Sequence, residues 1–187
     1  MGKVILITGG QRSGKSSFAE RMALELSNNP VYLATAMVRD AEFAKRVEIH
    51  KYRRGEQWTN VEECRYLSKI DFSGRVVVVD CITLWLSNIF WDISVDVEKE
   101  YMGKLSQVEM GVMAVNRSLE FLKEEFLKLT EQDATFIFVT NEIGFGGVSE
   151  NRLQRQFTDL QGWGNQFVAE NSNDVYLMVS GIRIKIK

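Results

Sequence analysis

Histidine, proline and cysteine are scarce in this sequence of 187 residues, which holds one histidine, one proline and two cysteines. The single histidine, His50, excludes any metal site built from several imidazoles. The single proline excludes proline-rich linkers. The cysteines, Cys64 and Cys81, have neither the spacing of a zinc site nor the number that a disulfide framework needs. A reduced, cytoplasmic location is therefore the simplest expectation.

The sequence also lacks an excess of positive charge and a long hydrophobic run. Lysine and arginine total 23 against 25 aspartate and glutamate, a formal net charge of −2. Nucleic-acid binders usually carry a basic excess, so we expect no nucleic-acid partner. No stretch approaches the ~20 apolar residues that a membrane-spanning helix needs, so we expect no membrane span. The first apolar run, residues 4–7, is too short for the core of a signal peptide and is predicted to be a strand.

Apolar runs alternate with helical patterns along the chain, which predicts an α/β fold with a mostly parallel sheet flanked by helices. A chain of this length, with 45% hydrophobic residues, suits one domain over residues 1–187. Helices are predicted at 15–26, about 40–54 and about 97–129. Strands are predicted at 4–8, 31–34, 76–79, 136–139 and 175–179, followed by a half-exposed strand over the alternating residues 182–187.

The predicted helix at 97–129 carries a stripe of apolar residues with heptad spacing. One interpretation is a helix that lies on the sheet. The other is a helix that gives part of its stripe to a subunit contact, and periodicity alone does not separate the two. The stripe consists of Leu105, Val108, Val112, Val115, Leu119, Leu122, Phe126 and Leu129.

The strongest local motif fits the pattern G-x-x-x-x-G-K-[ST] at every fixed position. It follows an apolar strand and opens a helix, which is the context of a phosphate-binding loop. Its backbone N–H groups are expected to wrap phosphate oxygens at the positive end of the helix. Lys15 is predicted to reach the β- and γ-phosphates, and Ser16 to ligate Mg²⁺. The predicted nucleotide-binding residues of this loop are Gly9, Gly10, Gln11, Arg12, Ser13, Gly14, Lys15 and Ser16.

An acidic residue, Asp80, directly follows the strand predicted at 76–79. Nucleotide-binding proteins of this kind place a carboxylate at such a strand end to hold Mg²⁺ or its water shell. The alternative is an aspartate that caps the next segment. We predict that Ser16 and Asp80 together hold the metal.

The one histidine lies in a basic segment, residues 46–54. If this segment is helical, His50 shares one face with Arg46, Arg53 and Arg54. Repulsion from the arginines disfavours the imidazolium form, and the guanidinium groups suit phosphate oxygens. Such a site favours nucleophilic attack by His50 on a nucleotide phosphate. From the residues alone, an ordinary histidine on an exposed helix remains the alternative.

Together these motifs resemble the bifunctional adenosylcobinamide kinase / adenosylcobinamide-phosphate guanylyltransferase family of cobalamin biosynthesis. The resemblance runs from residue 5 to residue 187 and is far more specific than a phosphate loop alone. Two positions depart from the family pattern, because Gly55 and Ser149 stand where proline is usual. Beyond the loop and the basic segment, the resemblance to the family rests on residues 32–36, 62–63, 80–83, 86–88, 140–144, 151–153 and 165–166.

The resemblance implies a P-loop NTPase-type fold, a homotrimer and two activities that use ATP, GTP and Mg²⁺. The kinase activity phosphorylates adenosylcobinamide with ATP or GTP. The guanylyltransferase activity takes GMP from GTP onto a histidine and passes it to adenosylcobinamide phosphate, giving adenosylcobinamide-GDP. His50 falls on the nucleophile, and Lys15 joins it as a catalytic residue. Family nucleotide contacts also fall on Ala34, Thr35, Ala36, Lys51, Tyr52, Arg53, Arg54, Glu62, Asp80 and Thr83.

Two other functions fit the phosphate loop. One is a small-molecule kinase that lacks the nucleotidyl step, and the other is an NTP-driven switch or assembly ATPase. Neither of them needs His50 in a basic segment. For a corrinoid substrate, Trp85, Trp91 and Trp163 are candidates to stack on the large ring, with core packing as the alternative.

Overall fold

The computed structural model describes residues 2–37 and 55–187. Within these residues, seven strands form one sheet in the order β3-β2-β4-β5-β1-β6-β7. All neighbouring strands are parallel except β6 and β7, which confirms the predicted mostly parallel sheet. The strands are β1 Lys3–Gly9, β2 Val31–Ala34, β3 Thr59–Glu62, β4 Val76–Asp80, β5 Thr135–Val139, β6 Asp174–Val179 and β7 Ile182–Lys185.

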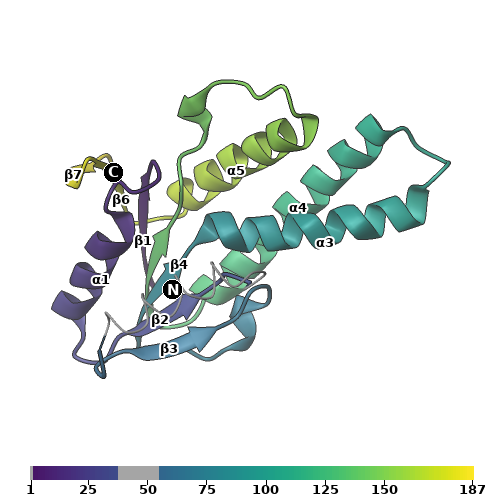
Figure 1. Cartoon of the computed structure of the whole chain (residues 1–187). Helices are drawn as coiled ribbons and strands as arrows, with labels where there is room; N and C mark the ends of the chain where they lie inside the picture. Colours follow the sequence, from purple (N-terminus) through teal and green to yellow (C-terminus); the bar gives the residue numbers. More distant parts are fainter. Residues whose placement is uncertain (1, 38–54) are drawn as a thin grey trace.

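Helices cover both faces of the sheet (Figure 1). Helix α1 (Lys15–Leu26) packs on one face, and α3 (Ile82–Tyr101), α4 (Gln107–Thr130) and α5 (Arg152–Glu170) pack on the other. No helix of the described residues is long and apolar enough to cross a membrane. The helix predicted at about 40–54 lies outside the described residues.

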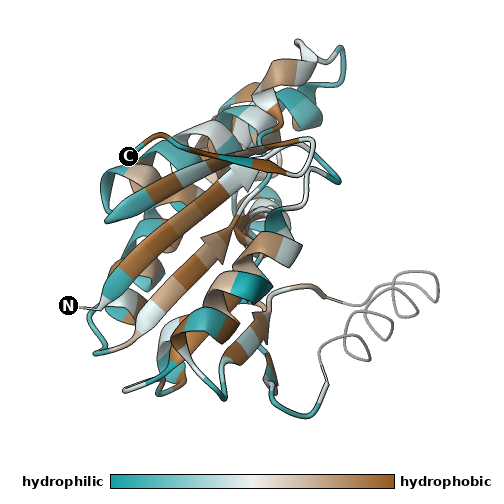
Figure 2. Ribbon diagram, turned by 90° about the vertical axis from the view of Figure 1, so that its left-hand side faces the viewer, coloured by the Kyte–Doolittle hydropathy of each residue, from teal (hydrophilic) through white to brown (hydrophobic). Residues whose placement is uncertain are grey.

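The central strands are buried on both faces, which explains their continuous apolar runs. Along β1, Ile5 and Ile7 contact the core under α1, whereas Val4 and Leu6 contact the core under the other helices. Figure 2 shows these strands as a brown, hydrophobic layer. The strand ends are thereby held rigidly, and loops at those ends can position functional groups.

The helix predicted at 97–129 is wrong in extent, because the chain turns between α3 and α4. Helix α3 ends at Tyr101, and Gly103 follows with a φ of 77°. Ser106 then starts α4 with a capping box: its hydroxyl accepts the Glu109 N–H, and the Glu109 carboxylate accepts the Ser106 N–H at 2.8 Å. Leu105 therefore lies outside both helices.

The apolar stripe divides along α4. Val115 is 5% exposed, and Phe126 is fully buried with its ring 5.1 Å from that of Phe138 on β5. Val108 and Val112 are 58% and 52% exposed. Figure 1 shows why, since the first half of α4 lies beside α3 beyond the sheet. The prediction of a helix on the sheet is thus confirmed for the second half of α4 only.

The two outer strands depart from the sequence prediction. β3 was not predicted, because it contains no apolar run; it pairs with β2 and is braced where the Arg75 guanidinium donates to the Thr59 hydroxyl at 3.0 Å. β7 is exposed along its whole length rather than half-exposed. No residue of β7 belongs to the buried core, and the Arg183 guanidinium of β7 lies over the ring of Phe18 on α1 at 5.4 Å.

Candidate functional site

The loop between β1 and α1 forms a cradle whose backbone requires glycine. Gly9 has a φ of 151°, and a Cβ there would lie 2.4 Å from the carbonyl oxygen of Met178. Gly14 has a φ of 94° and opens α1. The turn between β6 and β7 supports the loop from outside, because the Gly181 N–H donates to the Ser13 carbonyl at 3.0 Å. The predicted phosphate cradle is therefore built into the sheet and not a mere surface loop.

Lys15 lies at the base of this cradle and is only 7% exposed. Its ammonium group donates to the Gly10 carbonyl at 2.6 Å. Burial lowers the pKa of Lys15, and the nearby Cys81 and Asp80 partly oppose that effect. A phosphate oxygen is a stronger partner for an ammonium group than a neutral carbonyl. Lys15 is thus placed to neutralise an anion bound in the loop.

Three strand ends bring further predicted site residues to the same edge of the sheet. Ala34, the last residue of β2, is paired with Glu62 on one side and Asp80 on the other. Asp80 is in turn paired with Val139 of β5, and β5 adjoins β1. Glu62, Ala34 and Asp80 therefore form a row along the carboxyl edge, where open parallel sheets bind ligands.

Asp80 and Ser16 offer oxygen ligands of the kind that Mg²⁺ prefers. The Asp80 carboxylate is half-buried and accepts the Tyr32 hydroxyl at 2.6 Å, which fixes one of its oxygens. Within residues 2–37 and 55–187, no group of three or more acidic, histidine or cysteine side chains could hold a metal without other ligands. The residues fit a magnesium ion that takes its remaining ligands from nucleotide phosphates and water.

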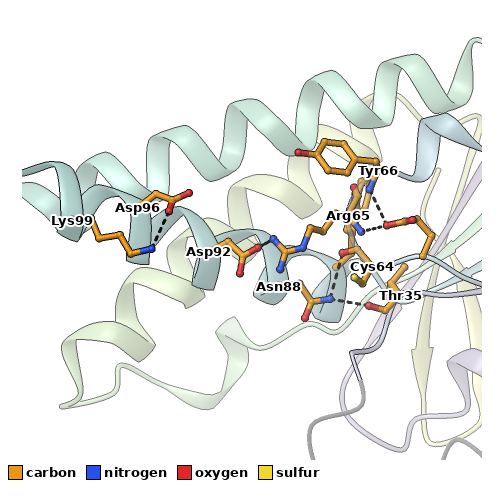
Figure 3. A network of polar contacts seen from close by, with 10 residues as sticks. Thr35, Cys64, Arg65, Tyr66, Asn88, Asp92, Asp96 and Lys99 are labelled. Atoms are coloured by element: carbon orange, nitrogen blue, oxygen red, sulfur yellow. Dashed lines mark hydrogen bonds and ion pairs between the residues drawn. The ribbon is translucent and has the colours of Figure 1, made fainter.

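Thr35 braces the end of β2 against the start of α3. Its hydroxyl donates to the Cys81 carbonyl at 2.7 Å and accepts the Cys81 N–H at 2.8 Å. The Asn88 amide donates to the Thr35 carbonyl at 2.8 Å and to the Cys64 carbonyl at 3.4 Å (Figure 3). Thr35 is fully buried. Its side chain therefore lies behind the strand ends and supports them from within the protein.

The segment after β3 is attached to the same helix. The Trp85 indole N–H donates to the Arg65 carbonyl at 2.9 Å, and Arg65 forms an ion pair with Asp92. The Glu63 carboxylate accepts the backbone N–H groups of Arg65 and Tyr66 (Figure 3). Trp85 is fully buried, so it packs in the core and does not stack on a ligand.

A polar network connects β5, α3 and α5, and it was not assembled from the sequence. The Thr83 hydroxyl accepts the Asn141 N–H at 2.9 Å. The Thr140 hydroxyl donates to Asn165 at 2.7 Å, and the Gln161 amide donates to both of these residues. Gln161 and Asn165 are four residues apart on α5 and so share a face, which was the available signal. Of this network, only Thr83 was a predicted nucleotide contact.

The remaining predicted site residues fall into two groups. Gly10, Gln11 and Arg12 are exposed at the mouth of the loop, and Ala36 is half-buried after Thr35. The basic segment lies outside the described residues, so its part in the site stays a prediction. This second group contains His50, Lys51, Tyr52, Arg53 and Arg54.

Similarity to known proteins extends over almost the whole chain. Residues 5–186 match the family model described as cobinamide kinase / cobinamide phosphate guanyltransferase. The bifunctional adenosylcobalamin biosynthesis protein CobU of Escherichia coli is 35% identical, with 98% of this chain and 99% of that protein covered. The corresponding CobU of Salmonella typhimurium is 32% identical over the same shares. The bifunctional protein CobP of Pseudomonas aeruginosa is 34% identical over 97% and 96%.

Solved structures support the fold alone. An ATPase from a type III secretion system of pathogenic bacteria superimposes with a TM-score of 0.54 at 12% identity. The match covers 95% of this chain and 51% of that one. This likeness agrees with the mostly parallel sheet flanked by helices and says nothing of the ligand or the reaction. The phosphate cradle, the ordered strand ends and the full-length matches together place this chain in the cobinamide kinase / cobinamide phosphate guanyltransferase family, whose members are bifunctional enzymes.

Proposed function

We propose that this chain phosphorylates adenosylcobinamide with ATP or GTP and then transfers GMP from GTP to the product through His50. The observation that carries the proposal is the glycine-shaped cradle, with the buried Lys15 beneath it and Asp80 at the same edge of the sheet. The family has both activities, which favours this function over a kinase that lacks the nucleotidyl step.

In the kinase step, the hydroxyl oxygen of adenosylcobinamide attacks the γ-phosphorus of the nucleotide. The bond from that phosphorus to the β–γ bridging oxygen breaks, the nucleoside diphosphate leaves, and the hydroxyl proton passes to solvent. N–H groups of the loop hold the phosphate oxygens, and Lys15 neutralises the charge that develops between them. Ser16 and Asp80 would hold Mg²⁺, which when bound offsets phosphate charge.

In the nucleotidyl step, an imidazole nitrogen of His50 attacks the α-phosphorus of GTP and pyrophosphate leaves. A phosphate oxygen of adenosylcobinamide phosphate then attacks the same phosphorus, the P–N bond breaks, and the imidazole is regenerated. The nucleotide contacts proposed for these steps are Gly9 to Ser16, Ala34, Ala36, Lys51, Tyr52, Arg53, Arg54, Glu62, Asp80 and Thr83. Thr35, also predicted as a contact, is fully buried and supports these residues from behind the strand ends.

Covalent labelling tests the proposal. The protein is incubated with GTP labelled at the α- or γ-phosphate and denatured in mild alkali. We expect α-label that is retained, lost in acid and absent in His50→Ala. Lys15→Gln is expected to lose phosphorylation of adenosylcobinamide, whereas Lys3→Gln, at the opposite end of β1, keeps it. Phosphorylation without retained α-label would leave a kinase only.

We also propose a homotrimer and a cytoplasmic location. The exposed Val108 and Val112 on the outer half of α4 support a subunit contact. Both cysteines are free thiols, which supports a reducing compartment. Light scattering checks the assembly, and Val112→Glu is expected to shift it toward the monomer. A monomeric wild-type protein would contradict the trimer. We expect no nucleic-acid partner, given the net charge of −2.

A further inference from the structure

A groove of about 500 Å³ lies between α3 and the first turns of α5. Its walls combine aromatic and aliphatic side chains with hydroxyl and amide groups, and they carry a single carboxylate. Trp91 and Leu153 are 54% and 51% exposed there. The lining residues are Ser87, Phe90, Trp91, Ser94, Val95, Glu98, Asn151, Leu153, Gln154 and Phe157.

The groove begins beside the carboxyl edge of the sheet, where Asp80 ends β4, and runs away from it along α3. Ser87 lies one turn beyond Thr83, and the next residue, Asn88, holds the carbonyl of Thr35. Glu98 lies eleven residues further along α3, which at 1.5 Å per residue is about 16 Å. Figure 1 shows α3 leading away from the end of β4. A ligand in this groove therefore has one end near the phosphate cradle and its body outside the sheet.

We propose that this groove binds the corrin ring of adenosylcobinamide, an inference that rests on the proposed function. The ring is a broad conjugated surface fringed by amide side chains, and its cobalt centre carries positive charge. Trp91 and Leu153 offer apolar surface to the ring. The side-chain amides of Asn151 and Gln154 can form hydrogen bonds with the amides of the ring. The Glu98 carboxylate carries a charge opposite to that of the cobalt centre. The arm that bears the reacting hydroxyl then extends past Ser87 toward the cradle.

Of the three tryptophans considered for stacking on the ring, one lies in the wall of this groove. Trp85 is fully buried, and its indole N–H is engaged by the Arg65 carbonyl. Trp163 is 46% exposed on α5, but it does not line the groove. Of the three candidates, only Trp91 combines exposure with a place in the groove wall. Trp163 thus provides a matched control for truncation of an exposed tryptophan.

Equilibrium dialysis with cobinamide, whose colour reports the bound fraction, tests the inference directly. Trp91→Ala is expected to weaken binding by about tenfold, the effect of losing one stacked aromatic ring. Leu153→Ser is expected to weaken it in the same direction. Trp163→Ala should bind like the wild type. Because formation of the GMP–enzyme from GTP needs no corrinoid, all three variants should retain α-label.

The outcomes separate this inference from the proposed function. Wild-type affinity in both Trp91→Ala and Leu153→Ser would overturn the groove as the corrinoid site while leaving the enzyme activity intact. Wild-type protein that neither binds nor phosphorylates cobinamide would overturn both. Light scattering adds a third result: dissociation of the assembly by Trp91→Ala with unchanged cobinamide affinity would assign the groove to a subunit contact and overturn the inference.

Discussion

Replacing Thr35 with valine tests whether its hydroxyl stabilises the carboxyl edge of the sheet, where β2 and β4 end. Valine has nearly the same shape, so the change removes one oxygen and creates no large cavity. That oxygen serves both the N–H and the carbonyl of Cys81. Both backbone groups lie at the junction of β4 and α3, where Cys81 is 6% exposed. The Cys81 carbonyl keeps the Trp85 N–H as a partner at 3.0 Å, so the variant leaves one donor, the Cys81 N–H, buried without this acceptor.

The expected loss of stability follows from this unpaired N–H group. A buried polar group left without a partner costs about 1–3 kcal/mol, so Thr35→Val should lose about 1–3 kcal/mol. For a chain of this size, about 2 kcal/mol lowers the Tm by about 4–8 °C. Thr130→Val is the matched control, because Thr130 is also fully buried. Its hydroxyl contacts the Phe126 and Leu127 carbonyls within α4, which keep their helical partners, so the expected loss is about 1 kcal/mol or less.

Urea unfolding followed by far-UV circular dichroism measures both variants. Equal m-values would show that both unfold from native states of similar compactness, and the midpoints then give the two free energies. A loss in Thr35→Val no larger than that in Thr130→Val would refute the reasoning, because the bridge to Cys81 would then carry no net stability.

Two further predictions concern the cradle and the strand end. Gly9→Ala is expected to lower the Tm sharply, since its Cβ would lie 2.4 Å from the Met178 carbonyl, whereas Gly10→Ala meets no atom within 4 Å and should melt like the wild type; equal melting would contradict the packing argument. Burial raises the pKa of the Cys81 thiol to about 12 from a usual value of 9.0. Between these values the folded chain keeps a proton that the unfolded chain has lost, so the stability from this group is complete below pH 9 and falls above it by about 1.4 kcal/mol per pH unit. Urea unfolding at pH 8 and pH 10 should show this slope in the wild type and in Cys64→Ala but not in Cys81→Ala, and a slope retained in Cys81→Ala would assign it to other groups.

The glycine-rich loop and the residues at the carboxyl edge of the sheet could be predicted from the sequence because their signals are local, whereas their contacts with a nucleotide stay a prediction. The phosphate loop is one short segment, and its flanking strand and helix are strongly patterned. Asp80 needed one further inference, that an acidic residue after a buried strand lies at the carboxyl edge. The register of β4 with β2, and of β2 with β3, places it there. These residues are consecutive in the chain or directly follow a strand, so the sequence alone was enough to predict where they lie.

Other features depend on contacts between distant segments, which periodicity does not report. The apolar stripe carries Leu105 in phase with α4 across the turn, so spacing alone suggested one helix. The capping box of Ser106 and Glu109 was the signal that places the start of α4. β3 has no apolar alternation, and only its pairing with β2 makes it a strand. The groove beside α3 likewise needs α5, which lies more than fifty residues away in the chain.

Helix α3 connects the two proposed binding sites, that of the nucleotide and that of the corrin ring. Its first turns are fixed to the strand ends, since Asn88 holds the Thr35 carbonyl and Thr83 holds the Asn141 N–H. Its later turns form one wall of the groove that we assign to the corrin ring. A helix keeps a constant rise per residue, so the distance along α3 from the strand ends to the proposed ring site is set by one rigid element. In the proposed complex, the length of α3 therefore sets how far the corrin ring lies from the strand ends that position the nucleotide.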